Sequence, residues 1–143
     1  MKKNEIDKNE IIEILKKCNL KSTPQRIEIF RFLKSTKIHP SPDLIFSKLK
    51  KKFNTISRAT VYNTVQTLYN KGIIKKLDFG EGFERCDGDS ENHLHFYCKK
   101  CKKILDIYKS LDRNFLKKIE QTENIKIDNT EIYIKGLCFK CKK

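Results

Sequence analysis

The chain has 143 residues, of which 38% are hydrophobic, and it carries a formal net charge of +14. This length allows one domain or two small ones. No apolar run reaches the roughly 18 residues that cross a bilayer, and the first ten residues lack the apolar core of a signal peptide, so the sequence predicts a cytoplasmic protein with no membrane partner. In such a reducing compartment, six cysteines favour metal binding over disulfides.

The positive charge is concentrated in the N-terminal part of the chain. Residues 1–80 contain 18 Lys and Arg against 7 Asp and Glu, a net of +11, whereas residues 81–143 contain 14 against 11, a net of +3. A basic segment of this kind predicts a polyanionic partner, most simply nucleic acid. The alternative is a lysine-rich, solvated surface without such a partner.

Four helices are predicted before Gly72. Helical spacing of apolar residues indicates the first, over residues 6–18. Thr23-Pro24 and Ser41-Pro42 are typical helix starts, because a hydroxyl caps the first turn and proline suits the first helical position. The expected core-facing residues of these three helices are Ile11, Ile12, Leu15, Ile27, Phe30, Leu33, Leu44, Ile45 and Leu49.

The fourth helix has the character of a DNA-reading helix. Ser57 can cap it and Gly72 can end it, while Val61, Val65 and Leu68 would face a core. Polar residues remain near its start, which is the part that enters the major groove in helix-turn-helix proteins. A β-hairpin over residues 73–77 and 83–86 would form a wing. The alternative is a generic helical domain with a hairpin. The candidate DNA-contacting residues are Arg26, Ser57, Arg58, Thr60, Tyr62 and Asn63.

The C-terminal part alternates predicted strands with one helix. Strands are expected over residues 93–97, 104–108, 125–127 and 132–137. A helix is expected over residues 110–122, with Leu111, Phe115, Leu116 and Ile119 on one face. The predicted fold class is therefore α+β, with a winged-helix domain followed by a small α/β domain that carries the cysteines.

Two Cys-x-x-Cys pairs, Cys98/Cys101 and Cys138/Cys141, are 36 residues apart. Two such hooks brought together by a fold make a closed, tetrahedral zinc site, which would stabilise a domain too small for a large core. A redox-active dithiol or four incidental thiols are the alternatives. The remaining cysteines, Cys18 and Cys86, are left outside the predicted metal sites.

A second metal site is predicted around His93 and His95. These residues alternate, so on a strand both imidazoles share a face, and Asp87 and Asp106 are close in sequence. Mixed nitrogen and oxygen ligands suit Fe(II), Mn(II) or Zn(II) without choosing between them. His39 lies in the other half of the chain, and spacing alone does not place it at this site. Hydrogen-bonded structural histidines are the alternative.

Several motifs together resemble the ferric uptake regulator family along nearly the whole chain. The motifs are Ser22-Thr-Pro-Gln-Arg26, His39-Pro-Ser-Pro-Asp43, Ile56-Ser-Arg-Ala-Thr-Val-Tyr-Asn63, His93-Leu-His95, Cys98-Lys-Lys-Cys101 and Gly136-Leu-Cys-Phe-Lys-Cys141. The resemblance implies a homodimeric, metal-dependent repressor that binds palindromic double-stranded operator DNA. It further implies a winged-helix DNA-binding domain over residues 1–86 and a metal-binding dimerisation domain over residues 87–143. The stretch Thr64-Val65-Gln66 departs from relatives and leaves the operator sequence open.

Within that family, the chain looks most like the peroxide-sensing branch, which typically has Asp where iron sensors have Glu at the position of Asp106. The resemblance implies structural zinc at the four cysteines and regulatory Fe(II) or Mn(II) held by His39, Asp87, His93, His95 and Asp106. Hydrogen peroxide would then act through iron-catalysed oxidation of a ligand ring, expected at His39 or His93. An iron- or zinc-sensing repressor of the same family is the alternative. A zinc-dependent hydrolase is disfavoured, because the cysteine set has no open position and no H-E-x-x-H motif is present.

Overall fold

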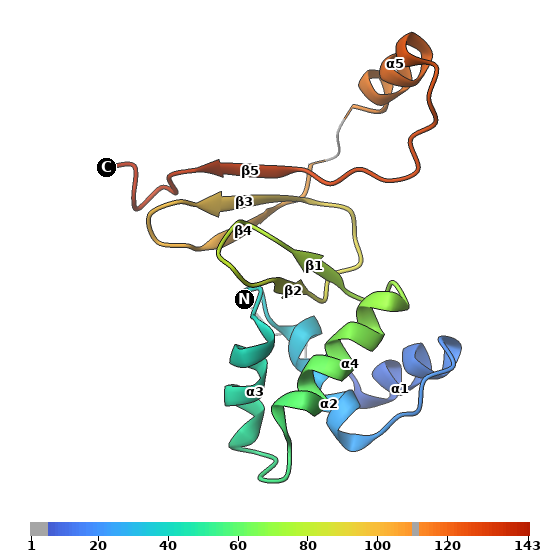
Figure 1. Cartoon of the computed structure of the whole chain (residues 1–143), viewed down its shortest axis with the longest axis vertical. Coiled ribbons are helices and arrows are strands. Elements are labelled where there is room, and N and C mark those ends of the chain that lie inside the picture. The colour runs from blue at the N-terminus through green and yellow to red at the C-terminus, as the bar shows by residue number, and fades with distance from the viewer. Residues whose placement is uncertain (1–5, 110–111) are drawn as a thin grey trace. The chain divides into compact units, whose positions relative to one another are not determined.

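The computed structural model describes residues 6–109 and 112–143, and its contacts divide the chain into two compact units, Met1–Ser90 and Glu91–Lys143 (Figure 1). We call these the N-terminal and C-terminal units. The N-terminal unit contains α1 (Lys8–Lys17), α2 (Pro24–Ser35), α3 (Pro42–Lys50), α4 (Arg58–Asn70), β1 (Lys75–Leu77) and β2 (Arg85–Asp87). The C-terminal unit contains β3 (Leu94–Cys98), β4 (Ile104–Ile107), α5 (Arg113–Glu123) and β5 (Tyr133–Gly136). The predicted α+β class is confirmed.

Side-chain caps fix where three helices of the N-terminal unit begin. The hydroxyl of Thr23 accepts a hydrogen bond from the backbone N–H of Arg26 at 3.3 Å, and Ser41 does the same for Leu44 at 3.2 Å. Ser57 caps α4 by accepting from the N–H of Thr60 at 3.0 Å. Each cap satisfies a donor that the first turn leaves without an intrahelical partner. The start signals of the sequence are therefore used as predicted.

The core of the N-terminal unit forms where the four helices and the hairpin meet. Ile11 and Leu15 of α1 are fully buried, as are Phe30 of α2, Ile45 of α3 and Leu68 of α4. The hairpin pairs β1 with β2 in antiparallel register. A hydrogen bond of 2.9 Å from the N–H of Cys86 to the carbonyl of Pro40 ties β2 to the segment between α2 and α3. This arrangement is the predicted helical domain with a wing.

Gly88 brings the chain after β2 unusually close to α2. A Cβ at this position would lie 2.5 Å from the carbonyl carbon of Leu33 and 2.8 Å from the backbone nitrogen of Lys34. No side chain fits in that space, because both neighbours are backbone atoms. The glycine therefore allows Asp87 to be held beside α2.

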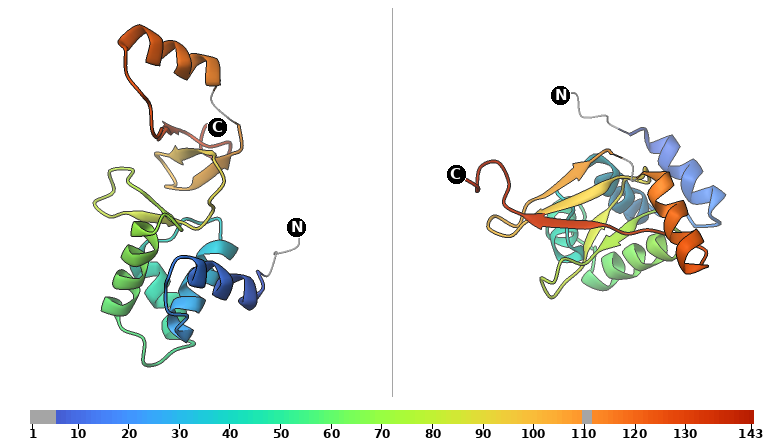
Figure 2. Two further views of the ribbon diagram at one scale, coloured as in Figure 1. Left: turned by 90° about the vertical axis from the view of Figure 1, so that its right-hand side faces the viewer. Right: turned by 90° about the horizontal axis from the view of Figure 1, so that it is seen from above.

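The C-terminal unit is built on a three-stranded sheet in the order β4-β3-β5. β3 pairs antiparallel with β4 and parallel with β5, so α5 lies in the crossover between β3–β4 and β5 (Figure 2). None of the described residues of α5 is buried, and Phe115 is 56% exposed. The predicted helix began at Ser110, but Ser110 and Leu111 lie outside the described residues. Within the described ranges, no helix is both long and apolar enough to span a membrane.

The predicted strand over residues 125–127 is wrong. This segment, which the structure describes, forms no strand. The N–H of Ile125 instead donates to the carbonyl of Glu120 at 3.1 Å, and the N–H of Ile127 donates to the Glu120 carboxylate at 2.8 Å. The end of α5 takes up the backbone donors that a sheet would have needed, so alternating isoleucines were a misleading signal.

Candidate metal centres and nucleic-acid face

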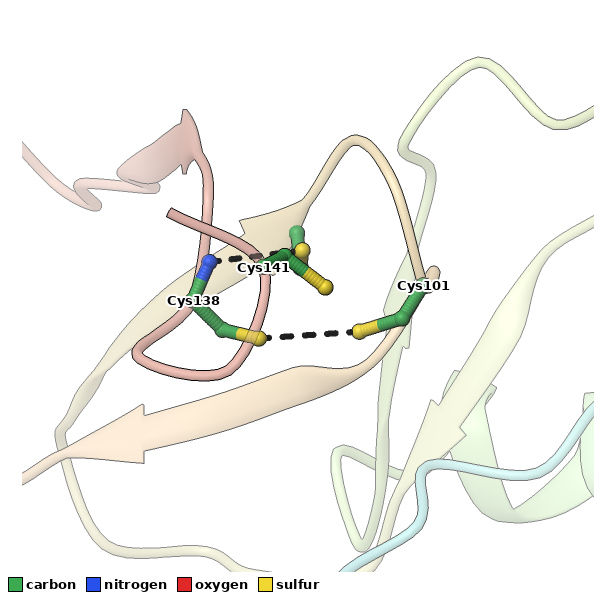
Figure 3. A group of neighbouring side chains, drawn as sticks. Cys101, Cys138 and Cys141 are labelled. Atoms are coloured by element: carbon green, nitrogen blue, oxygen red, sulfur yellow. Dashed lines mark hydrogen bonds between the residues drawn. The ribbon is translucent and has the colours of Figure 1, made fainter. Parts of the chain in front are cut away.

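Four cysteines come together at one end of the C-terminal unit. Cys98 ends β3 and Cys101 lies in the turn to β4, while Cys138 and Cys141 belong to the turn after β5. Their four Sγ atoms all lie within 4.8 Å of one another. The Sγ atoms of Cys101 and Cys138 face each other at 3.7 Å (Figure 3). With Zn–S bonds of about 2.3 Å, the edge of a tetrahedral site is about 3.8 Å, so this set fits zinc. A disulfide, at about 2.05 Å, is a different geometry.

Backbone hydrogen bonds shape the two turns that carry the cysteines. The N–H of Lys102 donates to the carbonyl of Cys98 at 2.9 Å, and the N–H of Cys141 donates to that of Cys138 at 2.9 Å. The N–H of Cys138 also donates to the Sγ of Cys98 at 3.3 Å. Backbone hydrogen bonds from Cys101 and Cys138 lower the pKa of Cys98 to about 6, whereas a side-chain hydrogen bond with Cys138 raises the pKa of Cys141 to about 12. A lowered thiol pKa favours the thiolate, which is the form that binds zinc.

A second group of possible ligands lies on the sheet formed by β3 and β4. His95 of β3 is directly opposite Asp106 of β4 in the strand register. The Oδ1 atom of Asp106 is 3.8 Å from the Nε2 atom of His95 and 3.4 Å from the Nε2 atom of His93. The two imidazole centroids are 4.5 Å apart. Two nitrogens and a carboxylate oxygen thus converge on one point.

Hydrogen bonding orients the ring of His93 toward this point. Its Nδ1 atom is 2.8 Å from the carbonyl oxygen of Glu91. When Nδ1 carries the proton and donates to this carbonyl, Nε2 holds the lone pair that a metal needs. This donor set is mixed nitrogen and oxygen, in contrast to the all-sulfur set of the cysteines. The arrangement fits a divalent metal such as Fe(II) or Mn(II).

The N-terminal unit holds the other two predicted ligands together. His39, between α2 and α3, is 2% exposed, and Asp87, at the end of β2, is 4% exposed. The Nε2 atom of His39 lies 4.0 Å from the Oδ1 atom of Asp87, which also accepts a hydrogen bond of 2.9 Å from the N–H of Asp89. His39 has a left-handed backbone, with φ of 50°. A residue with a Cβ adopts this conformation at a cost, and only where its surroundings impose it.

The predicted DNA-contacting residues gather mainly on the exposed start of α4. Arg58, Tyr62 and Asn63 are exposed, whereas Ser57 and Thr60 are engaged with each other in the cap, their hydroxyl oxygens 2.9 Å apart. Arg26 on α2 is half-buried, and its Nη1 atom donates to the carbonyl of Lys21 at 2.7 Å. Arg58, Tyr62 and Asn63 are therefore the members of the predicted set whose side chains are available for contact with bases, whereas Ser57 caps α4 and Arg26 binds the backbone before α2.

Two residues that the sequence did not single out touch these sites. Asp43 at the start of α3 forms an ion pair with the guanidinium of Arg58. The pKa of Tyr62 is raised, first by partial burial and then by the Asp43 carboxylate. Tyr108 lies beside the second metal group, with its ring centroid 5.1 Å from that of His93 and its hydroxyl 3.5 Å from Asp106. Its position two residues after Asp106, on the same face of an extended segment, was the available signal. For Asp43, the sequence holds no signal of this contact beyond its place at the start of a predicted helix.

Comparison with known proteins gives the family. Residues 17–135 match the ferric uptake regulator family, so the match covers most of the chain. The peroxide-responsive repressor PerR of Staphylococcus epidermidis is 37% identical over 136 residues, covering 94% of this chain and 89% of that protein. The chain belongs to the ferric uptake regulator family.

Two solved structures are similar in fold. The ferric uptake regulator Fur of Helicobacter pylori superposes with a TM-score of 0.81 over 100% of this chain and 98% of that one, at 24% identity. The Campylobacter jejuni peroxide stress regulator gives a TM-score of 0.70 at 28% identity, covering 91% of this chain and 98% of that one. These similarities confirm the predicted combination of a winged-helix domain and a small α/β domain.

Proposed function

We propose that this protein is a metal-dependent transcriptional repressor that responds to hydrogen peroxide and acts in the cytoplasm as a homodimer. The observation that carries the proposal is the convergence of His93, His95 and Asp106 at one point of the β3–β4 sheet, separate from the four-cysteine zinc set. The similarity to a peroxide-responsive repressor and to a peroxide stress regulator supports the same assignment. The domains proposed for these tasks are residues 1–86 for DNA binding and 87–143 for dimerisation.

The regulatory site is proposed to use ligands from both units. His93, His95 and Asp106 form one part, and the buried pair of His39 and Asp87 forms the other. A metal that binds all five favours the arrangement in which the units meet, so metal binding and domain orientation are coupled. That arrangement would set the distance between two α4 helices of a dimer to match the half-sites of a palindromic operator.

The response to peroxide rests on the imidazole ligands. A bound Fe(II) would act as the catalyst: hydrogen peroxide would take two electrons from a ligand imidazole, one of its oxygen atoms would be inserted into a ring C–H bond, and the other would leave as water. His39 and His93 are the proposed targets. An oxidised ring is a poorer ligand, so the link between the units weakens and the operator is released. Each chain undergoes this change once, without turnover, and the protein is therefore proposed to be a regulator and no enzyme.

Dimerisation is proposed to occur through apolar residues of the C-terminal unit. Leu105 of β4, Phe115 of α5 and Ile134 of β5 are between 37% and 56% exposed, although each is large and apolar. A helix without a buried face is only marginally stable by itself. A second copy of the same surface would cover these residues, as an isologous interface does.

Anaerobic loading with Fe(II), followed by stoichiometric peroxide, tests the proposed function. We expect a mass gain of one oxygen per chain, located by peptide mapping on His39 or His93, together with loss of operator binding. The Mn(II)-loaded protein is the matched control and should keep both its mass and its operator.

An iron-sensing repressor would behave differently in the same experiment. Its operator affinity would follow Fe(II) concentration, and peroxide would leave its histidines unmodified. That result would replace the peroxide proposal with the iron-sensing one.

A further inference from the structure

The net positive charge of the C-terminal unit is confined to the end that carries the four cysteines. Residues 91–143 contain 13 Lys and Arg and 7 Asp and Glu. Seven of the 13 basic residues, and none of the acidic ones, lie in the two segments 98–103 and 138–143. The rest of the unit carries 6 basic and 7 acidic residues, so it is almost neutral. A lysine-rich composition alone does not produce this segregation.

The fold places these seven lysines on one end of the unit. The Sγ atoms of Cys101 and Cys138 are 3.7 Å apart, so the turns that carry the lysines are held against each other. The N–H of Lys99 donates to the carbonyl of Gly136 at 2.8 Å and joins the turns a second time. All seven lysines are exposed. A zinc ion with four thiolates carries a charge of −2, which leaves the end with a net charge of about +5.

An exposed aromatic ring stands among these lysines. Phe139 is 68% exposed, the highest value among the large apolar residues of the described chain. The Nζ atoms of Lys142 and Lys143 lie 5.7 and 4.8 Å from its ring centroid, within the range of a cation–π contact. Zinc binding requires none of this, because Phe139 lies between two ligands without being one. Lysines around an exposed ring are the combination that single-stranded nucleic acids recognise, by phosphate pairing and base stacking.

We propose that the zinc end, defined as the seven lysines of residues 99–103 and 140–143 together with Phe139, is a binding surface for single-stranded nucleic acid. The lysines pair with successive phosphates, and one unpaired base stacks on Phe139. This surface is distinct from α4, and it goes beyond the proposed repressor function. The inference does not depend on which metal occupies the regulatory site.

The observations favour a single strand over two other polyanions. In a duplex the bases are already stacked on one another, so Phe139 would gain little from it. An anionic membrane would also attract lysines, but among the described residues of the zinc end only Phe139 and the neighbouring Leu137 offer exposed apolar area. A single strand can pair its phosphates with the lysines and also stack a base on the ring of Phe139.

Fluorescence anisotropy with a labelled oligothymidylate of about 16 nucleotides tests the proposal on the full-length, zinc-loaded protein. Phe139→Leu should weaken binding about fivefold or more. Replacing Lys99, Lys100 and Lys140 with Gln should make the slope of log affinity against log salt less steep by about 2, because each phosphate contact contributes about 0.7. Both variants should keep their zinc and their affinity for operator duplex, which also separates this result from a failure of the repressor proposal.

A second triple variant supplies the control. Lys117, Lys118 and Lys126 are also exposed lysines of the C-terminal unit but lie outside the zinc end. Their replacement with Gln should leave the salt slope unchanged. The proposal is overturned if the two triple variants behave alike. It is also overturned if Phe139→Leu weakens binding to a random duplex as much as binding to the single strand. A third contrary result would be zinc-end variants that bind the single strand normally and lose only their affinity for anionic vesicles.

Discussion

Asp43 holds Arg58, one of the proposed DNA-contacting residues, in an ion pair. Arg58 and Asp43 are both largely exposed, yet their ion pair holds the guanidinium against α3, where it also lies 4.8 Å from the ring centroid of Phe46. On DNA, Arg58 would have to exchange this partner for a phosphate or a base. If Arg58 contacts DNA as proposed, the carboxylate would oppose binding to any duplex, and only a sequence that offers good base contacts would offset it.

Asp43→Asn should accordingly raise affinity for random duplex more than for operator. We expect a gain of about two- to fivefold on random DNA, in line with the strength of an exposed ion pair, and reduced discrimination between the two. Competition binding at several salt concentrations measures both. Glu13→Gln, which removes one exposed charge from α1, is the control. Equal gains for both variants would mean that only net charge matters.

Asp106 is the residue at which the type of response is expected to be set. Its Oδ1 atom lies near both His93 and His95, so its position determines how closely the carboxylate approaches a bound metal. Asp106→Glu keeps the charge but adds one methylene. The variant should still bind metal and operator, yet hold its operator at peroxide concentrations that release the parent protein. Gel-shift titration with peroxide measures this.

The matched control for Asp106→Glu is Asp112→Glu, which makes the same change at the N-cap of α5. Its peroxide response should equal that of the parent. If Asp106→Glu and the parent release operator at the same peroxide concentration, Asp106 does not set the response.

At the scale of elements, local chemistry made the N-terminal unit predictable. Three helix starts could be predicted because each capping side chain bonds a backbone N–H only three residues further along the chain. These caps are Thr23, Ser41 and Ser57. The C-terminal unit was less predictable, since the isoleucines at 125 and 127 alternate as in a strand while Glu120 takes their backbone donors. The cysteine spacing predicted the zinc set because tetrahedral coordination leaves little choice of partners.

The contact between Gly88 and α2 was not predictable, because it joins segments far apart in sequence. Gly88→Ala would place a methyl group against backbone, so β2 and α2 must separate. We expect a loss of about 1–3 kcal/mol of stability in the N-terminal unit. Weaker regulatory metal binding should follow, because Asp87 precedes the glycine. Thermal unfolding and metal titration measure the two effects. An unchanged melting temperature would show that the segment around Gly88 can move away from α2 without loss of stability.

At the scale of the whole molecule, the exposed apolar residues of the C-terminal unit lead to a prediction about assembly. Phe115→Asp should weaken the dimer by ~2 kcal/mol or more, because a charge would be buried at the interface. Sedimentation should then detect monomers at concentrations where the parent is dimeric, and operator affinity should fall with the loss of the second half-site. Lys117→Asp, on the same helix, introduces an acid at an already polar position and should have a smaller effect. Equal dimerisation by the parent and Phe115→Asp would place the interface elsewhere.

The contact between His39 and Asp87 is the part of the proposed site that sequence spacing could not supply. His93, His95 and Asp106 lie within fourteen positions of one another, and strand alternation brings them together. His39 and Asp87 are 48 positions apart and meet only because β2 is tied to the segment after α2. A long-range contact of this kind depends on the packed fold and leaves no periodic mark in the sequence.

The four-cysteine site makes the folding of this protein depend on the supply of zinc in the cell. Its ligands come from the β3–β4 turn and the turn after β5, so a bound metal would join these two turns at one end of the sheet. Because the binding energy of such a site is also folding energy, a cell starved of zinc would accumulate chains unable to complete this unit. Genes under this repressor would then be expressed without any oxidant. Zinc scarcity and oxidative stress would thus produce the same transcriptional output.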